Sequence, residues 1–192
     1  MRKFSFYKLI IAAALFVSMT ATLSAQIPVK RHEVEVALDA NYPLFSMPGL
    51  RNGFFGEFRI AYRNNLPDIP VALGGEVVYG AVQRGWGDTG WPSLTAAFTA
   101  EYDWLRGRNV SPFAGLGVGI GMCSSSRDTE YDFPKIWAAI YPFAPVISPR
   151  IGVEFWNGLR ITLKCQITRK EYSSVSLGIG YAFGGGRINK NN

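Results

Sequence analysis

The chain has 192 residues, of which 48% are hydrophobic, 14% aromatic and 18% charged. This composition excludes a disordered chain. Two cysteines are too few for a disulfide-stapled miniprotein, and the length argues against a multidomain enzyme. The formal net charge is +6, but residues 1–25 hold three basic residues and no acid. The remaining positive charge is small and scattered, which argues against nucleic acid as a partner.

Residues 1–25 have the pattern of a cleaved secretory signal peptide. A basic n-region comes first and is formed by Arg2, Lys3 and Lys8. An apolar h-region over 9–17 and the tripeptide Leu-Ser-Ala at 23–25 complete the pattern. An uncleaved anchor is the alternative, but the h-region is shorter than the roughly 20 residues that a membrane helix needs. We therefore expect a signal peptide at 1–25, one β-barrel domain at 26–183 and a flexible tail at 184–192.

After the signal peptide, hydrophobicity repeats every two residues, which is the period of a β-strand. Between Ser93 and Trp104, for example, an apolar face with Leu94, Phe98 and Trp104 alternates at every position with a face of small or polar side chains. Eight windows behave in this way: Glu33–Ala40, Gly53–Arg63, Val71–Gln83, Ser93–Trp104, Pro112–Met122, Val146–Trp156, Leu159–Thr168 and Ser174–Phe183. The pattern predicts an all-β fold of about eight antiparallel strands.

Short and long connections alternate between these strands, as in an outer-membrane barrel with short periplasmic turns and longer extracellular loops. The pair Asn157–Gly158 favours a tight type I′ hairpin turn. The sixth strand is the weakest, because Pro142, Pro145 and Pro149 interrupt it. An ordered extracellular loop over 136–149 is the alternative there.

The small side chains of the polar face indicate that this face lies inside the barrel. A soluble lipocalin-like barrel also alternates, but its apolar face points inward and its outer face carries long polar groups. Here the polar face is built mainly from glycine, serine and alanine, as in the glycine run of 115–121. We predict an up-and-down transmembrane barrel whose narrow interior is filled by side chains, with Phe98, Leu116 and Leu163 facing lipid.

Parity places ten charged side chains in the lumen, half acidic and half basic: Glu57, Arg59, Arg63, Glu76, Glu101, Asp103, Arg150, Glu154, Arg160 and Lys164. Because an unpaired charge is costly in such an interior, we expect an ion-pair network that fills it. A narrow path for protons or small solutes is the alternative.

Even-numbered strands end in aromatic residues, which we expect to form a periplasmic girdle at the membrane interface: Tyr62, Tyr102, Trp104, Phe155, Trp156, Tyr181 and Phe183.

Three segments carry a resemblance to a known group of proteins: SPFAGLGVGIG (111–121), SPRIGVEFWNGLRITLKCQ (148–166) and VSLGIGYAFGGG (175–186). They resemble the small eight-stranded outer-membrane barrels of Bacteroidetes-type bacteria, which are OmpX-like and OmpA-like in architecture. The resemblance implies residence in the outer membrane of a Gram-negative bacterium. The last strand, which ends at Phe183, resembles the signal read by the outer-membrane assembly machinery, although here 184–192 continue beyond it.

Catalytic, cofactor and metal sites are not indicated. His32 is the only histidine and precedes the first predicted strand, and no G-x-S-x-G motif is present. Cys123 and Cys165 lie on strands separated by another strand, too far apart for a disulfide unless the loop after Cys123 folds back. We expect no enzyme and no cofactor.

The loops are the best place for specific interactions, and their aromatic residues are possible binding anchors: Trp86, Trp91, Tyr131 and Trp137. The expected partners are outer-membrane lipid and lipopolysaccharide, the assembly machinery during biogenesis, and an extracellular protein or glycan. We expect a monomer that serves envelope structure or surface interaction. The alternatives are a narrow channel and a soluble periplasmic lipid-binding barrel with its faces reversed.

Overall fold

The computed structural model describes residues 29–45, 53–82, 91–123, 143–156, 158–168 and 173–184. The predicted signal peptide and all but the first residue of the predicted tail lie outside these residues. No helix in the described part of the chain is long and apolar enough to cross a bilayer.

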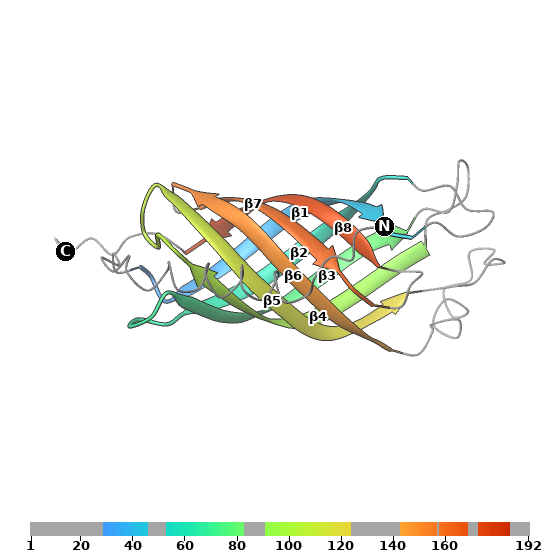
Figure 1. Ribbon diagram of the computed structural model, residues 1–192, viewed down its shortest axis with the longest axis horizontal. Helices are drawn as coiled ribbons and strands as arrows, with labels where there is room; N and C mark the ends of the chain where they lie inside the picture. Colours follow the sequence, from blue (N-terminus) through green and yellow to red (C-terminus); the bar gives the residue numbers. More distant parts are fainter. Residues whose placement is uncertain are drawn as a thin grey trace, which may run out of the picture.

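Eight antiparallel strands form one closed barrel, in which each strand pairs with its neighbours in the sequence and the first pairs with the last (Figure 1). The strands are β1 (His32–Pro43), β2 (Phe55–Asn65), β3 (Val71–Val82), β4 (Trp91–Asp103), β5 (Val110–Cys123), β6 (Ala144–Phe155), β7 (Leu159–Gln166) and β8 (Ser174–Phe183). The predicted fold class is confirmed. The strand boundaries lie within three residues of those predicted from the two-residue period.

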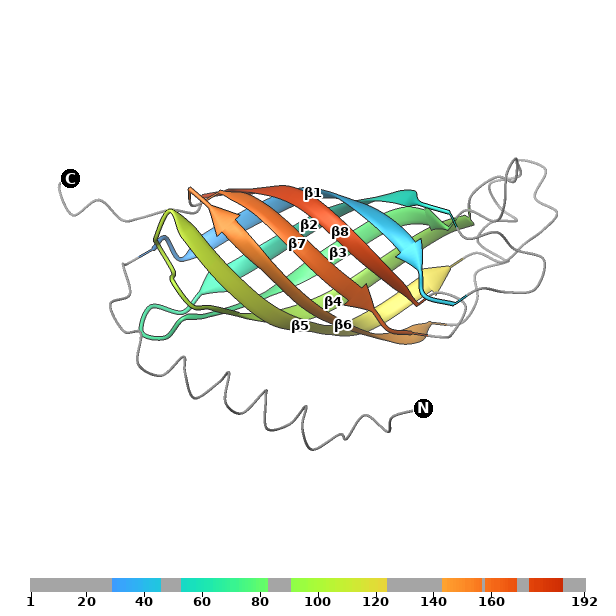
Figure 2. The same ribbon diagram turned by 45° about the horizontal axis from the view of Figure 1, so that its top comes forward.

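The strands are staggered around the barrel. Paired residues traced around it from Phe55 return to β2 at Asn65, so that the register shifts by ten residues on closure. Such a stagger requires the strands to tilt by roughly 35–45° from the barrel axis, and both ribbon views show them crossing the long axis obliquely (Figure 2). An eight-stranded barrel of this kind has an interior that side chains can fill.

The two faces of the sheet are sharply different. Phe98 is 83% exposed on the outer wall, and Leu116 and Leu163 are 46% and 45% exposed. The residues between such apolar positions are buried in the lumen, as the alternating burial of β1, β2 and β8 shows. The predicted orientation of the faces is therefore confirmed, and a soluble barrel with reversed faces does not fit this structure.

Two of the three prolines near the sixth strand lie within it. β6 begins at Ala144 and runs through Pro145 and Pro149, so an extracellular loop is the wrong interpretation for this part of 136–149. Both prolines face outward. Ile147 and Ile167 exchange two backbone hydrogen bonds of 2.9 and 2.8 Å, but Pro149 has no N–H for the next bond toward β7. The prolines are thus tolerated at the cost of a short β6–β7 ladder.

The turn between β6 and β7 differs from the predicted Asn157–Gly158 turn. The backbone N–H of Gly158 donates to the carbonyl of Phe155 at 3.1 Å, and Trp156 adopts a φ of 50°. The turn therefore begins one residue earlier than predicted. A bulky residue in the left-handed region costs about 1–2 kcal/mol. The indole of Trp156 is 72% exposed and packs against Phe155, with ring centroids 5.8 Å apart.

Candidate functional site

The lumen holds the largest collection of polar side chains in the described residues. We call the end of the barrel with the β2–β3, β4–β5 and β6–β7 turns the turn end, and the opposite end the loop end (Figure 2). All ten charged residues assigned to the lumen by parity lie inside it, and nine of them are buried. Glu154 is the exception, because its side chain near the turn end is 15% exposed.

The first strand contributes three further carboxylates that the predicted set missed. Glu33, Glu35 and Asp39 are 6%, 2% and 4% exposed and face the lumen. The predicted equality of acids and bases inside the barrel is therefore wrong. The alternation of β1, with Val34 and Leu38 outward, is the signal that would have found these residues.

The charges near the turn end form a group, which we call the turn-end cluster: Glu33, Glu35, Arg63, Glu101, Asp103, Arg106, Glu154 and Arg160. Arg63 and Arg160 link four of the carboxylates, and Asp103 and Arg106 form a pair beside them. Its five carboxylates meet three guanidinium groups. Arg63 alone lies 3.0 Å from both Glu33 and Glu35, 3.4 Å from Glu101 and 4.0 Å from Glu154. One side chain of β2 therefore joins β1, β4 and β6 across the lumen.

Arg160 of β7 is the second centre of the turn-end cluster. Its Nη2 lies 2.7 Å from Glu101, and its other nitrogens lie 3.4 Å from Glu35 and from Glu154. Its guanidinium carbon is 3.7 Å from the ring centroid of Phe113, a buried cation–π contact. Gly152 leaves room for that ring, because a Cβ there would overlap the ring of Phe113.

Arg106 links two neighbouring turns at the turn end of the barrel. It lies in the β4–β5 turn, where strand parity does not apply, and it is 7% exposed. Its guanidinium donates to the carbonyls of Leu66 and Ile69 at 2.9 and 3.0 Å and to Oδ1 of Asn65 at 3.2 Å. It also lies 3.5 Å from Asp103. One side chain thus ties the β2–β3 turn to the β4–β5 turn beneath the lumen.

A second group lies nearer the loop end, and we call it the loop-end cluster: Asp39, Asn41, Glu57, Arg59, Glu76, Arg150 and Lys164. Its three carboxylates meet three basic groups, mostly in pairs. Arg150 and Glu76 form a two-pronged contact of 2.7 and 2.6 Å across the barrel. The contacts of Lys164 with Asp39 and Glu57 are longer, at 3.4 and 3.7 Å.

The two clusters are connected. Arg59 of the loop-end cluster lies 3.0 Å from Asp39 and 2.9 Å from Glu35 of the turn-end cluster. Arg150 similarly approaches Glu101 at 3.7 Å. Charged contacts therefore continue from one cluster to the other along the barrel interior.

Glycines on the inner face make room for these long side chains. A Cβ at Gly178 would overlap Oδ1 of Asp39, and a Cβ at Gly117 would overlap Oγ of Ser148. The same Cβ at Gly117 would lie 2.8 Å from Nη2 of Arg150. The small inward-facing residues noted in the sequence therefore leave the space that the ion pairs occupy.

This arrangement is suited to filling the barrel. Salt bridges and hydrogen bonds compensate the charges in an interior where isolated charge is costly. Among the described residues, no group of three or more His, Cys, Asp or Glu side chains is placed to hold a metal ion. The only histidine, His32, is the first residue of β1 and not a residue before the strand; it is exposed, and its Nδ1 lies 2.7 Å from the hydroxyl of Tyr62.

The girdle residues lie near the turn end, where several of them form ring contacts. Tyr102 packs edge-on against Trp104, and Tyr181 packs against Phe183, with centroids 5.4 and 4.9 Å apart. The remaining members described by the structure are Tyr62, Phe155 and Trp156. This ring of aromatic side chains surrounds the closed end of the lumen.

The other residues singled out in the sequence do not join a site. Trp86, Tyr131 and Trp137 lie outside the described residues. The backbone of Trp91 pairs with Val82, and its side chain is outside the described part. Cys165 is a free thiol on β7, separated by β6 from the strand that carries Cys123.

The closed barrel of eight antiparallel strands, with its charged interior and apolar wall, defines the fold class of small outer-membrane barrels. Neisserial surface protein A (NspA) has a similar solved structure, with a TM-score of 0.64 and 12% identity over 81% of this chain and 98% of that one. Ail, the attachment invasion locus protein of Yersinia pestis, has a TM-score of 0.48 and 14% identity over 82% of this chain and 100% of that one. The N-terminal barrel of Pseudomonas aeruginosa OprF also has a TM-score of 0.48 and 14% identity, over 80% of this chain and 99% of that one. No protein-family model and no curated protein sequence matches the chain.

Proposed function

We propose that the chain is an integral protein of the outer membrane of a Gram-negative bacterium, with a lumen closed by its own side chains. The observation that carries this proposal is the contrast between the two faces. Large apolar groups such as Phe98 and Leu38 are exposed all around the outer wall, while the charges are buried in ion pairs. In water such a wall would be a large exposed apolar surface, whereas hydrocarbon satisfies it.

The orientation in the membrane follows from the two ends of the barrel. The short turns at the turn end suit the periplasmic side, which leaves the longer connections to face the cell exterior. We propose that these loops support envelope structure or surface interaction, with lipopolysaccharide and an extracellular protein or glycan as partners. We propose that the barrel acts as a monomer.

A narrow channel for small solutes or ions is the second candidate. Two buried acceptors, Oδ1 of Asn41 and Oγ1 of Thr162, lack a hydrogen-bond partner within the described residues and face the interior. Water could reach such groups from the loop end. The buried ion pairs that cross the lumen, such as Arg150–Glu76 and Arg160–Glu101, argue against a continuous path.

Two measurements test these proposals in sequence. First, the mature chain should sediment with outer membranes and should migrate differently in detergent gels before and after heating. A freely water-soluble chain would overturn the membrane assignment. Second, the purified barrel in a planar bilayer should give no steady single-channel steps, whereas sizeable regular steps would favour the channel.

The role of the loops needs a separate experiment on intact cells. Each long connection is replaced in turn by the matching loop of an unrelated eight-stranded barrel, and binding of extracellular proteins and glycans is measured. Loss of binding with one loop, while the barrel still folds, would support surface interaction. Unchanged binding in every replacement would contradict it.

A further inference from the structure

The outer wall is not uniformly bulky near the loop end of β1, β2 and β8. There the small residues Ala40 and Gly56 lie directly opposite each other on neighbouring strands. A Cβ placed on Gly56 would meet nothing within 4 Å. The two adjacent small residues therefore leave a depression two strands wide in the wall.

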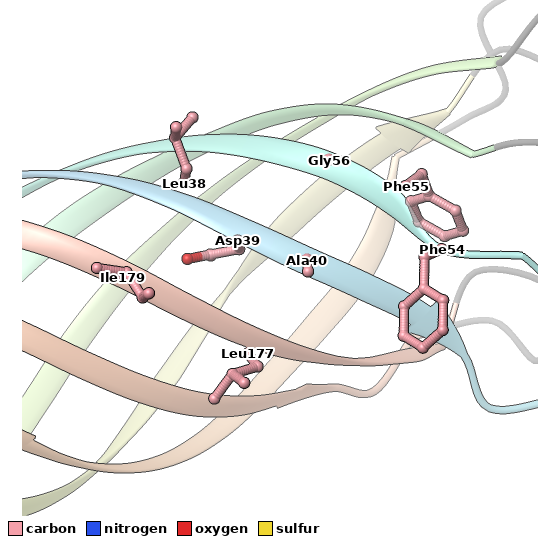
Figure 3. Close-up of a pocket in the computed structure, with 8 residues that line it drawn as sticks. All are labelled: Leu38, Asp39, Ala40, Phe54, Phe55, Gly56, Leu177 and Ile179. Atoms are coloured by element: carbon pink, nitrogen blue, oxygen red, sulfur yellow. The ribbon is translucent and has the colours of Figure 1, made fainter.

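Apolar side chains surround this depression and make it a groove of about 730 Å³. Leu38, Leu177 and Ile179 form the side along β1 and β8, with exposures of 69%, 55% and 60%. Figure 3 shows them around Ala40 and Gly56, with the ring of Phe54 at the loop end. The volume lies within the roughly 300–1,000 Å³ of small-molecule sites.

The groove offers no polar group to an occupant. Asp39 borders it, but the carboxylate of Asp39 points inward and lies 3.0 Å from Nε of Arg59. The backbone of β1 is paired on both edges, with β2 and with β8, so an added peptide strand would find no free N–H or C=O. An occupant must therefore be apolar and without hydrogen-bonding needs, which describes a hydrocarbon chain.

The position of the groove along the barrel selects the leaflet. The rings of Tyr42 and Phe54 meet at its loop end, with centroids 5.1 Å apart, and aromatic pairs of this kind mark a membrane interface. A chain that enters beside these rings would extend toward Leu38 and Ile179, away from the loop end. On the orientation proposed above, this is the outer leaflet, whose lipid is lipopolysaccharide.

We propose that the groove between β8, β1 and β2 binds one acyl chain of the lipid A moiety of lipopolysaccharide. This inference rests on the proposed function, since it takes the wall to face lipid. It goes further by assigning a particular site and a particular lipid chain. Ala40 and Gly56 form its floor, and Leu38, Phe54, Leu177 and Ile179 form its sides.

The test compares three variants of the mature chain folded in detergent. Ala40→Leu and Gly56→Leu fill the groove, whereas Ala96→Leu adds the same bulk to an outward position on β4. Ala96 lies between Val77 and Ile120, so the wall there has no two-strand depression. Binding of purified lipid A is measured by native mass spectrometry, with heat-modifiable gel migration as the check on folding.

We expect one tightly bound lipid A on the wild-type barrel and on Ala96→Leu. Filling the groove should weaken binding by about tenfold or more, because the loss of two buried methylene groups already has an effect of this size. Equal binding by all four folded proteins would overturn the groove while leaving the membrane assignment intact. A wild-type chain that shows no heat-modifiable folded form would instead overturn the proposed function. A dimer that only the groove variants lose would show a second copy as the occupant, and would also overturn the lipid assignment.

Discussion

The turn-end and loop-end clusters use the same residue types but connect them differently. In the turn-end cluster four of the five carboxylates share two guanidinium groups, since Arg63 contacts all four and Arg160 contacts three of them. The loop-end cluster has equal numbers of acids and bases, and its shortest ion pair is Arg150–Glu76, although Arg150 also lies 3.7 Å from Glu101. We therefore expect the first cluster to hold its strands together as a unit and the second to behave more nearly as pairs.

The largest effect is expected from Arg63→Met. The change leaves four nearby carboxylates with fewer positive partners in a buried site, so the free energy of unfolding should fall by about 3–5 kcal/mol. Urea titration of the barrel refolded into lipid vesicles measures this free energy. Arg108→Met, at an exposed arginine of the β4–β5 turn, is the control and should change little. Equal stability of the two variants would mean that Arg63 does not hold the cluster together.

A somewhat smaller effect is expected when the Arg150–Glu76 pair is broken. Each single change, Arg150→Met or Glu76→Met, should cost about 3 kcal/mol because it strands one buried charge. The double variant should be more stable than the sum of the two predicts, with a coupling of about 1.5 kcal/mol or more. The same vesicle titration gives all four free energies. Strict additivity would show that this pair does not act separately, and the contrast between the clusters would then fail.

The glycine positions give a smaller and more local effect. Gly178→Ala should cost about 2 kcal/mol, because its Cβ would overlap Asp39 and force the Asp39–Arg59 pair apart. Gly75→Ala, on the outer face of β3, is the control for the loss of a strand glycine, since its Cβ would meet the carbonyl of Ala97 at an ordinary 3.6 Å. Thermal unfolding followed by gel migration compares the two. A larger loss from Gly75→Ala would show that inner space is not the reason for glycine at 178.

The smallest effect is expected from Lys164→Met, at about 1 kcal/mol. Its contacts are long, and each of its partners keeps another one: Asp39 keeps Arg59, and Glu57 keeps the hydrogen bond of 2.6 Å from Asn41. Urea titration in vesicles again measures the change. A cost as large as that of Arg63→Met would show that the loop-end cluster also acts as one unit.

Much of the fold was predictable because a barrel strand repeats every two residues. The windows Ser93–Trp104 and Ser174–Phe183 carry this period without interruption, and β4 and β8 follow them closely. The inward position of Arg59 or Glu101 follows from the same parity. The same parity also places Glu33, Glu35 and Asp39 in the lumen, although the predicted set of lumen residues did not include them.

Other features depend on information that the period does not contain. Arg150 and Glu76 are 74 residues apart and meet across the lumen only because closure staggers the strands by ten residues. Arg106 lies in a turn, where no alternation assigns it a face. Pro149 was tolerated within β6 because it faces outward at a ladder position where only one bond is lost, and this depends on register. The pairing of charges therefore required the structure, although their location did not.

The ten-residue ladder between β1 and β8 has a consequence for the newly made chain. β1 is synthesised first, yet its second partner is the last strand to be completed. Until β8 pairs with β1, a partial sheet exposes two bare edges that can pair with other chains. A nascent barrel of this topology therefore depends on protection from aggregation until its final strand arrives, and truncation before Ser174 would leave both edges open permanently.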